Sequence, residues 1–101
     1  MGSGSGNFTV EDNIVPADSV AAILSLIAQI RASETQLGLD SSAEQNLKQA
    51  LDGLQREIEN RKPASWRVRE FLASIRNITE GAAGSLIASG ILYELSKLMP
   101  Q

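Results

Sequence analysis

The sequence predicts an all-α fold: a helical bundle of two antiparallel helices of about 20 residues and one long C-terminal helix. Three observations support this prediction. The apolar residues, 43% of the 101, are mostly Leu, Ile and Ala, which favour helices over strands. They recur at three- and four-residue steps in three separate stretches. The spacing is interrupted at Gly38 and at Lys62-Pro63, where residues of these types end helices.

We expect the helical domain to begin at Pro16. Residues 1–6 read Met-Gly-Ser-Gly-Ser-Gly, the composition of a flexible expression linker, so the rest is expected to be a piece of a larger protein. Residues 7–15 mix β-branched residues with Asn, Asp and Glu and predict an extended lead-in. The fixed φ of Pro16 suits the first turn of a helix. Residues 16–101 are therefore predicted to form a single helical-bundle domain.

The first helix is predicted to run from Pro16 to about Gln36. Its apolar residues share one helical face: Val20, Ile23, Leu24, Ile27 and Ile30. Leu26 and Ala28 widen this face, so the helix needs partners on more than one side. Gly38 is the predicted C-terminal stop.

The second helix is predicted from a capping box, in which Ser41 and Glu44 bond each other's backbone N–H. A narrow apolar stripe follows, made of Leu47, Leu51, Leu54 and Ile58. Opposite charges four residues apart predict that the rest of this helix faces solvent. The pairs are Glu44–Lys48, Asp52–Arg56 and Glu57–Arg61. Gly53 costs about 1 kcal/mol relative to Ala in mid-helix. Either a neighbouring backbone approaches closely there or the glycine is tolerated.

The third helix begins at Pro63 or Ser65, and its inner face is predicted to be Val68, Phe71, Leu72, Ile75 and Ile78. The same helical phase continues through Ala82, Leu86, Ser89 and Tyr93. This continuity predicts one helix over about 64–98, with Gly81 to Gly84 as the place for a kink. A break at Gly81 would give four helices instead.

Small residues repeat at four-residue steps in the last third of the chain, at Gly81, Ser85 and Ser89 and at Gly84 and Ala88. Such spacing lets another helix approach closely. A 35-residue helix spans about 52 Å against about 30 Å for each of the first two, so a monomer would leave part of it uncovered. The alternative is that these residues pack within the chain. The predicted interface residues are Gly84, Leu86, Ile87, Ala88, Ile91, Leu95 and Leu98.

The composition excludes several kinds of chemistry. The chain has no His and no Cys, which removes His- and thiolate-based metal sites, Cys nucleophiles, Ser-His-Asp triads and disulfides. It contains neither a Ser-x-x-Lys arrangement nor a phosphate-binding loop. We therefore predict that the chain is not an enzyme and that it binds neither a cofactor nor a small-molecule substrate. The remaining kind of metal site would need carboxylates brought together from different helices.

No membrane span is predicted, because the longest uncharged run, residues 81–93, is shorter than the roughly 20 residues that a span needs. The sequence does not begin with basic residues followed by an apolar run, the pattern of a secretory signal. The expected location is therefore cytoplasmic.

The predicted function is a non-catalytic oligomerisation or protein-interaction module whose partner is a second copy, most simply in a dimer. One alternative is a monomeric adaptor that binds a partner helix or a peptide. A minor alternative is a nucleic-acid binder, because residues 56–76 carry six basic residues against three acidic ones. Its candidate anion contacts are Arg61, Lys62, Arg67 and Arg69. The net charge of −3 over the whole chain argues against it.

Overall fold

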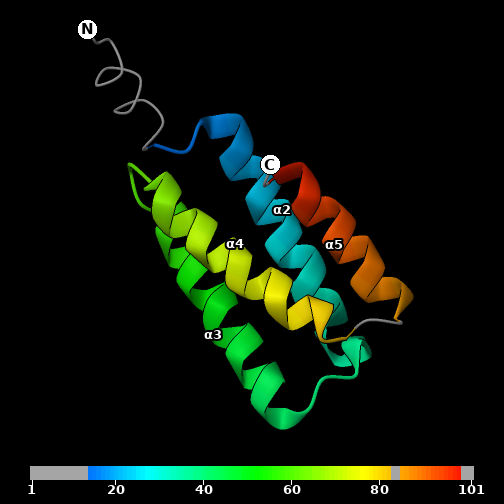
Figure 1. Ribbon diagram of the computed structural model, residues 1–101. Coiled ribbons are helices and arrows are strands. Elements are labelled where there is room, and N and C mark those ends of the chain that lie inside the picture. Colours follow the sequence, from blue (N-terminus) through cyan, green and yellow to red (C-terminus); the bar gives the residue numbers. More distant parts are fainter. Residues whose placement is uncertain (1–13, 83–84, 99–101) are drawn as a thin grey trace, which may run out of the picture.

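The computed structural model describes residues 14–82 and 85–98 (Figure 1). Within them the chain forms one short 3-10 helix and four α-helices, so the predicted all-α class is confirmed. The elements are α2 (Ala17–Ser33), η1 (Glu34–Leu37), α3 (Ser41–Ile58), α4 (Ser65–Glu80) and α5 (Leu86–Leu98). The predicted linker and the predicted lead-in up to residue 13 lie outside the described residues.

The helices pack as two adjacent pairs, α3 with α4 and α2 with α5, and the chain reverses direction from each helix to the next (Figure 1). The most extensive contact joins α3 and α4, while α2 also contacts α3 and α4 also contacts α5. Each helix therefore has two neighbours, and the four enclose a single core. Its fully buried large side chains come from α2, α3, α4 and α5: Ile30, Leu47, Leu51, Leu54, Ile75, Ile91 and Leu95.

The two described residues of the predicted lead-in attach the start of α2 to the connection between α3 and α4. Ile14 forms an isolated antiparallel bridge with Ala64, and the Val15 N–H donates to the Pro63 carbonyl at 3.0 Å. Pro16 follows in an extended conformation and α2 begins at Ala17, close to the predicted start.

The end of the first helical segment agrees with the sequence prediction. After Ser33 the chain tightens into η1, which buries Leu37. Gly38 follows with a φ of 71°, in the left-handed region that glycine adopts most readily. A glycine in this conformation cannot continue the helix. The predicted stop at Gly38 is therefore confirmed.

The predicted capping box of α3 is wrong by one residue. The N-cap is Asp40, whose side-chain oxygen accepts a hydrogen bond from the Ala43 N–H at 2.7 Å. The Asp40 carbonyl accepts the first helical bond from the Glu44 N–H. An aspartate caps a helix as well as a serine does, and this one lies where the chain is still extended.

The prediction of one long C-terminal helix is wrong, because α4 ends at Glu80. The Gly81 N–H donates to the carbonyls of Asn77 and Ile78, and the Ala82 N–H donates to the Thr79 carbonyl, which closes a turn. A new helix starts after Ser85, whose hydroxyl accepts a hydrogen bond from the Ala88 N–H at 3.2 Å. Ser85 is thus an N-cap, and α5 folds back onto α4 and α2.

This break changes which residues face the core. A continuous helix would have buried Leu86, Ser89 and Tyr93, but Leu86 is 90% exposed and Tyr93 is 63% exposed. The buried face of α5 consists instead of Ala88, Ile91 and Leu95, each 1% exposed. Burying a large aliphatic side chain contributes about 1.5–3 kcal/mol, and the turn and cap bonds replace part of the helical bonds lost at the break.

We expect the Ser85→Ala substitution to lower the free energy of unfolding by about 0.5–2 kcal/mol, because the first turn of α5 loses its cap. Thermal unfolding followed by circular dichroism would measure this loss. Ser89→Ala is the matched control, since Ser89 is exposed in mid-helix and alanine favours the helix there. Equal stability of the two variants would contradict the assignment of Ser85 as the cap.

Candidate functional site

Charge is distributed unequally between the two helix pairs. Helices α3 and α4 carry five charged residues each, whereas α2 has only Asp18 and Arg31 and α5 has only Glu94 and Lys97. The uncharged side chains that α2 exposes between its two charges are Ala21, Ala22, Leu24, Ser25, Ala28 and Gln29. One side of the bundle is therefore polar, and the other presents small and apolar residues.

The outer face of α5 is defined by Leu86, Gly90, Tyr93 and Lys97, which recur at four-, three- and four-residue steps. They lie on the side of the helix opposite the buried residues. The Lys97 Nζ atom is 4.6 Å from the centroid of the Tyr93 ring, and it also pairs with Glu94 at 3.8 Å. Leu86 and Tyr93 thus leave a large apolar surface in solvent, with a glycine between them.

The glycines of α3 and α5 differ in what surrounds them. A Cβ atom added at Gly53 would lie 2.6 Å from Cζ of Phe71, so the ring of Phe71 occupies the space beside this glycine. The sequence allowed a neighbouring backbone to approach Gly53 closely. In the structure, the side chain of Phe71 makes this approach instead. A Cβ atom added at Gly90 would meet nothing within 4 Å. Packing within the described chain thus explains Gly53 and does not explain Gly90.

The residues predicted to form an interface lie in different places. Ala88, Ile91 and Leu95 belong to the core of the chain itself and are not available on its surface. The remaining predicted residues that the structure describes are Leu86, which is exposed, and Ile87 and Leu98, which are half-buried. Gly84 lies outside the described residues. Tyr93 and Gly90, on the outer face of α5, were not among the predicted interface residues.

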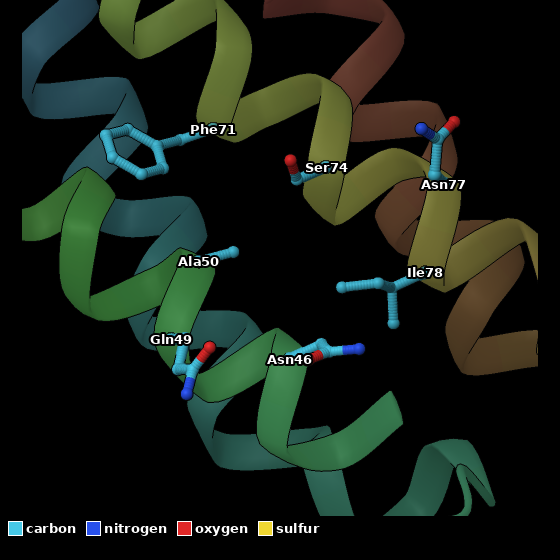
Figure 2. Close-up of a pocket in the computed structure, with 7 residues that line it drawn as sticks. All are labelled: Asn46, Gln49, Ala50, Phe71, Ser74, Asn77 and Ile78. Atoms are coloured by element: carbon cyan, nitrogen blue, oxygen red, sulfur yellow. The ribbon is translucent and has the colours of Figure 1, made fainter. Parts of the chain in front are cut away.

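A shallow groove of about 440 Å³ lies between α3 and α4 (Figure 2). It is lined by Asn46, Gln49 and Ala50 from α3 and by Phe71, Ser74, Asn77 and Ile78 from α4. Ser74 and Ile78 point toward α3, while Phe71 and Ala50 lie together at one end (Figure 2). No charged residue is among those that line this groove, although both helices are rich in charge.

The basic connection between α3 and α4 is partly used within the chain. Arg67 Nη1 lies 3.5 Å from Glu57 Oε1, and the guanidinium stands 5.4 Å from the centroid of the Trp66 ring. Glu57 is 7% exposed and also accepts a hydrogen bond from the Ala64 N–H at 2.9 Å. Glu57 therefore joins the end of α3 to the start of α4. The other candidate anion contacts, Arg61, Lys62 and Arg69, are exposed.

Ion pairs on the polar side connect different helices. Arg31 of α2 contacts Asp52 of α3 at 2.9 Å, and Lys48 of α3 contacts Glu34 of η1 at 3.8 Å. Among the described residues, these partners replace the predicted pairs of Asp52 with Arg56 and of Lys48 with Glu44. The Arg31–Asp52 pair is exposed at both ends, and such pairs contribute about 0–1 kcal/mol, so it stabilises the contact between α2 and α3 only slightly.

Comparisons with known proteins find no relative of this chain. No family model matches the sequence, and no curated protein or solved structure matches it. In the part of the chain that the structure describes, no helix is long and apolar enough to cross a membrane. Residues 14–82 and 85–98 also contain no group of three or more acidic side chains placed to hold a metal ion.

Proposed function

We propose that this chain is a non-catalytic protein-interaction module that self-associates through the outer face of α5. The observation that supports the proposal is Gly90, which lies inside α5 between exposed Leu86 and Tyr93 and at which an added Cβ atom would meet no described residue within 4 Å. Glycine in a helix interior costs about 1 kcal/mol relative to alanine. A second helix packed across Gly90 would explain the glycine and would remove both large side chains from water.

A second copy of this chain fits the outer face of α5 because the face is complementary to itself. With antiparallel α5 helices and a two-fold axis between Ser89 and Gly90, Leu86 of one copy lies opposite Tyr93 of the other. Such isologous contacts are the commonest in homo-oligomers. The chain has a net charge of −3, but α5 is uncharged from Leu86 to Tyr93, so two copies do not repel each other there.

Self-association of this kind would hold together and align whatever domains are attached to the module. A long uncovered helix no longer requires a partner, because α5 folds back and completes the core. The reason for association is instead the apolar surface that remains after the core is complete.

Sedimentation equilibrium over a wide range of protein concentration tests the proposal. We expect the mass of the unaltered chain to rise from 10.8 kDa toward twice that value. The Tyr93→Glu substitution should keep the chain monomeric, because it places a charge opposite Leu86 of the partner copy. Trp66→Glu is the matched control, since Trp66 is similarly exposed, at 54%, but lies on α4.

Two outcomes would contradict self-association through α5. The first is a monomeric mass for the unaltered chain at high micromolar concentration. The second is an equal effect of the Tyr93→Glu and Trp66→Glu substitutions, which would mean that association is not specific to the outer face of α5.

A further inference from the structure

A basic surface surrounds the start of α4, where the connection from α3 ends. Residues 61–69 contain four basic residues and no acidic one. The four are exposed, and Trp66, 54% exposed, lies among them: Arg61, Lys62, Arg67 and Arg69. Only Arg67 makes an ion pair with a described residue, which is Glu57. Three positive charges therefore have no acidic partner in residues 14–82 and 85–98.

The side chain of Arg67 has room for a second carboxylate. Its contact with Glu57 joins one nitrogen to one oxygen at 3.5 Å, and the other oxygen of Glu57 accepts the Ala64 N–H. A guanidinium carries five N–H donors, so this single contact leaves most of them for another acceptor. The guanidinium stands 5.4 Å from the centroid of the Trp66 ring. A carboxylate bound to Arg67 would therefore lie close to Trp66.

The chain enters the described part of the structure beside this surface. Ile14 pairs with Ala64 in an antiparallel bridge. In antiparallel pairing, the residues that precede one partner run alongside the residues that follow the other. The residues that follow Ala64 form the first turn of α4, which contains Trp66 and Arg67. Asp12 is two residues before Ile14, so it lies within about 7 Å of it along the chain, a distance that a long arginine side chain can bridge.

The segment that precedes Ile14 has the charge that the basic surface requires. Glu11 and Asp12 are consecutive, and the first 30 residues of the chain contain no Lys and no Arg. In an extended segment Val10 lies on the same side as Asp12, which places an apolar side chain next to the acidic one. Because the segment is tethered beside the surface, its effective concentration there is high, and an acidic partner from outside has to displace it.

We propose that the acidic segment of residues 10–12 docks on the basic surface at the start of α4 and covers it. The Asp12 carboxylate pairs with the Arg67 guanidinium, Val10 contacts the Trp66 ring, and Glu11 adds a second negative charge. The docked segment keeps external polyanions off this surface. The outer face of α5 takes no part in the contact, so docking does not depend on self-association.

Fluorescence quenching of Trp66 tests the docking, because the chain has no other tryptophan. Replacing both acids, Glu11→Gln with Asp12→Asn, should raise the quenching constants of acrylamide and of iodide about twofold at low salt, since the segment leaves the ring. The matched control is Glu44→Gln with Glu80→Gln, which changes the net charge equally at the start of α3 and the end of α4. It should leave both constants unchanged.

A double-mutant cycle shows whether Arg67 holds the segment. The Arg67→Gln substitution should raise the quenching constants as the two acid substitutions do, and combining them should raise the constants no further. With Arg76→Gln in place of Arg67→Gln, the acid substitutions should keep their full effect, because Arg76 lies more than two turns farther along α4. Circular dichroism checks that each variant keeps its helices.

A polyanion probe distinguishes the chain's own segment from an external occupant. Single-stranded oligothymidine of about 12 nucleotides, within the usual range of binding-site sizes, serves as the probe. At low salt it should bind the variant without the two acids about tenfold more tightly than it binds the unaltered chain or the control variant.

Three results would overturn the docking of the acidic segment. One is a set of quenching constants that the acid substitutions leave unchanged. Another is a rise for iodide without a rise for acrylamide, which would mean that the acids repel an anion without covering the ring. The third is equal affinity of the oligonucleotide for the unaltered chain and for the variant without the two acids, which would mean that the surface is open to external anions.

Discussion

The Ala88→Phe substitution should destabilise the chain strongly at every protein concentration. Ala88 is 1% exposed on the inner side of α5, where α5 contacts α2 and α4, so a ring has no space there. Overpacking of a filled core costs about 1–3 kcal/mol and occasionally more. Since about 1 kcal/mol shifts the melting temperature of a 100-residue domain by roughly 4–8 °C, thermal unfolding measures the effect readily.

The concentration dependence of that melting distinguishes a core residue from an interface residue. If Ala88 were at an interface between copies, as the sequence alone indicates, the substitution would lower the oligomer mass and leave the dilute chain as stable as before. Leu86→Phe is the matched control, because Leu86 is 90% exposed on the same helix and should tolerate the ring. Equal melting temperatures for the dilute Ala88→Phe variant and the unaltered chain would contradict the placement of α5.

The Gly53→Ala substitution should lower the free energy of unfolding by up to about 2 kcal/mol, although alanine favours helices by about 1 kcal/mol over glycine. The new methyl group would lie within 3 Å of the Phe71 ring, so α3 and α4 would have to separate or the ring would have to move. Denaturant unfolding measures the change. Gly90→Ala, tested at a concentration where the chain is monomeric, should have the opposite sign, because nothing lies within 4 Å of its added Cβ.

A double-mutant cycle with Phe71→Ala isolates the contact between Gly53 and the ring. Once the ring is absent, Gly53→Ala should stabilise the chain through helix propensity alone. A Gly53→Ala variant that is equally destabilised with and without the Phe71 ring would show that the glycine is required for another reason.

The sequence predicts the parts of this fold that local chemistry determines. The stripes of α2, α3 and α4 have helical spacing, and Gly38 ends the first helical segment because its φ of 71° suits glycine. The break after Glu80 could not be read from spacing, because the apolar residues continue in phase past Gly81 by coincidence. The local signal for the break is Ser85 as an N-cap, and the energy for it comes from burying Ile91 and Leu95 against distant helices.

The candidate surfaces are less predictable from sequence than the helices. The spacing predicted Tyr93 on the inside because the third helix was expected to continue past Gly81. Since α5 begins anew after Ser85, Tyr93 lies on the outer face of α5 instead. The groove depends on the contact between Phe71 of α4 and Gly53 of α3. The spacing of residues along one helix does not predict which residue of another helix they will contact. Of the predicted interface residues, Leu86 is exposed and Ile87 and Leu98 are half-buried, so their contact with a second copy stays a prediction.

Disulfide trapping at Gly90 tests the proposed self-association most directly, because the chain has no cysteine of its own. If α5 crosses α5 of a second copy at this glycine, the Gly90→Cys variant should form a disulfide-linked dimer under mild oxidation, since the two Cα atoms approach within about 7 Å. Ser89→Cys should behave similarly. The control Ser74→Cys places an exposed thiol in the middle of α4 and should remain monomeric. Dimers that form at the same rate from the Gly90→Cys and Ser74→Cys variants would contradict an interface on α5.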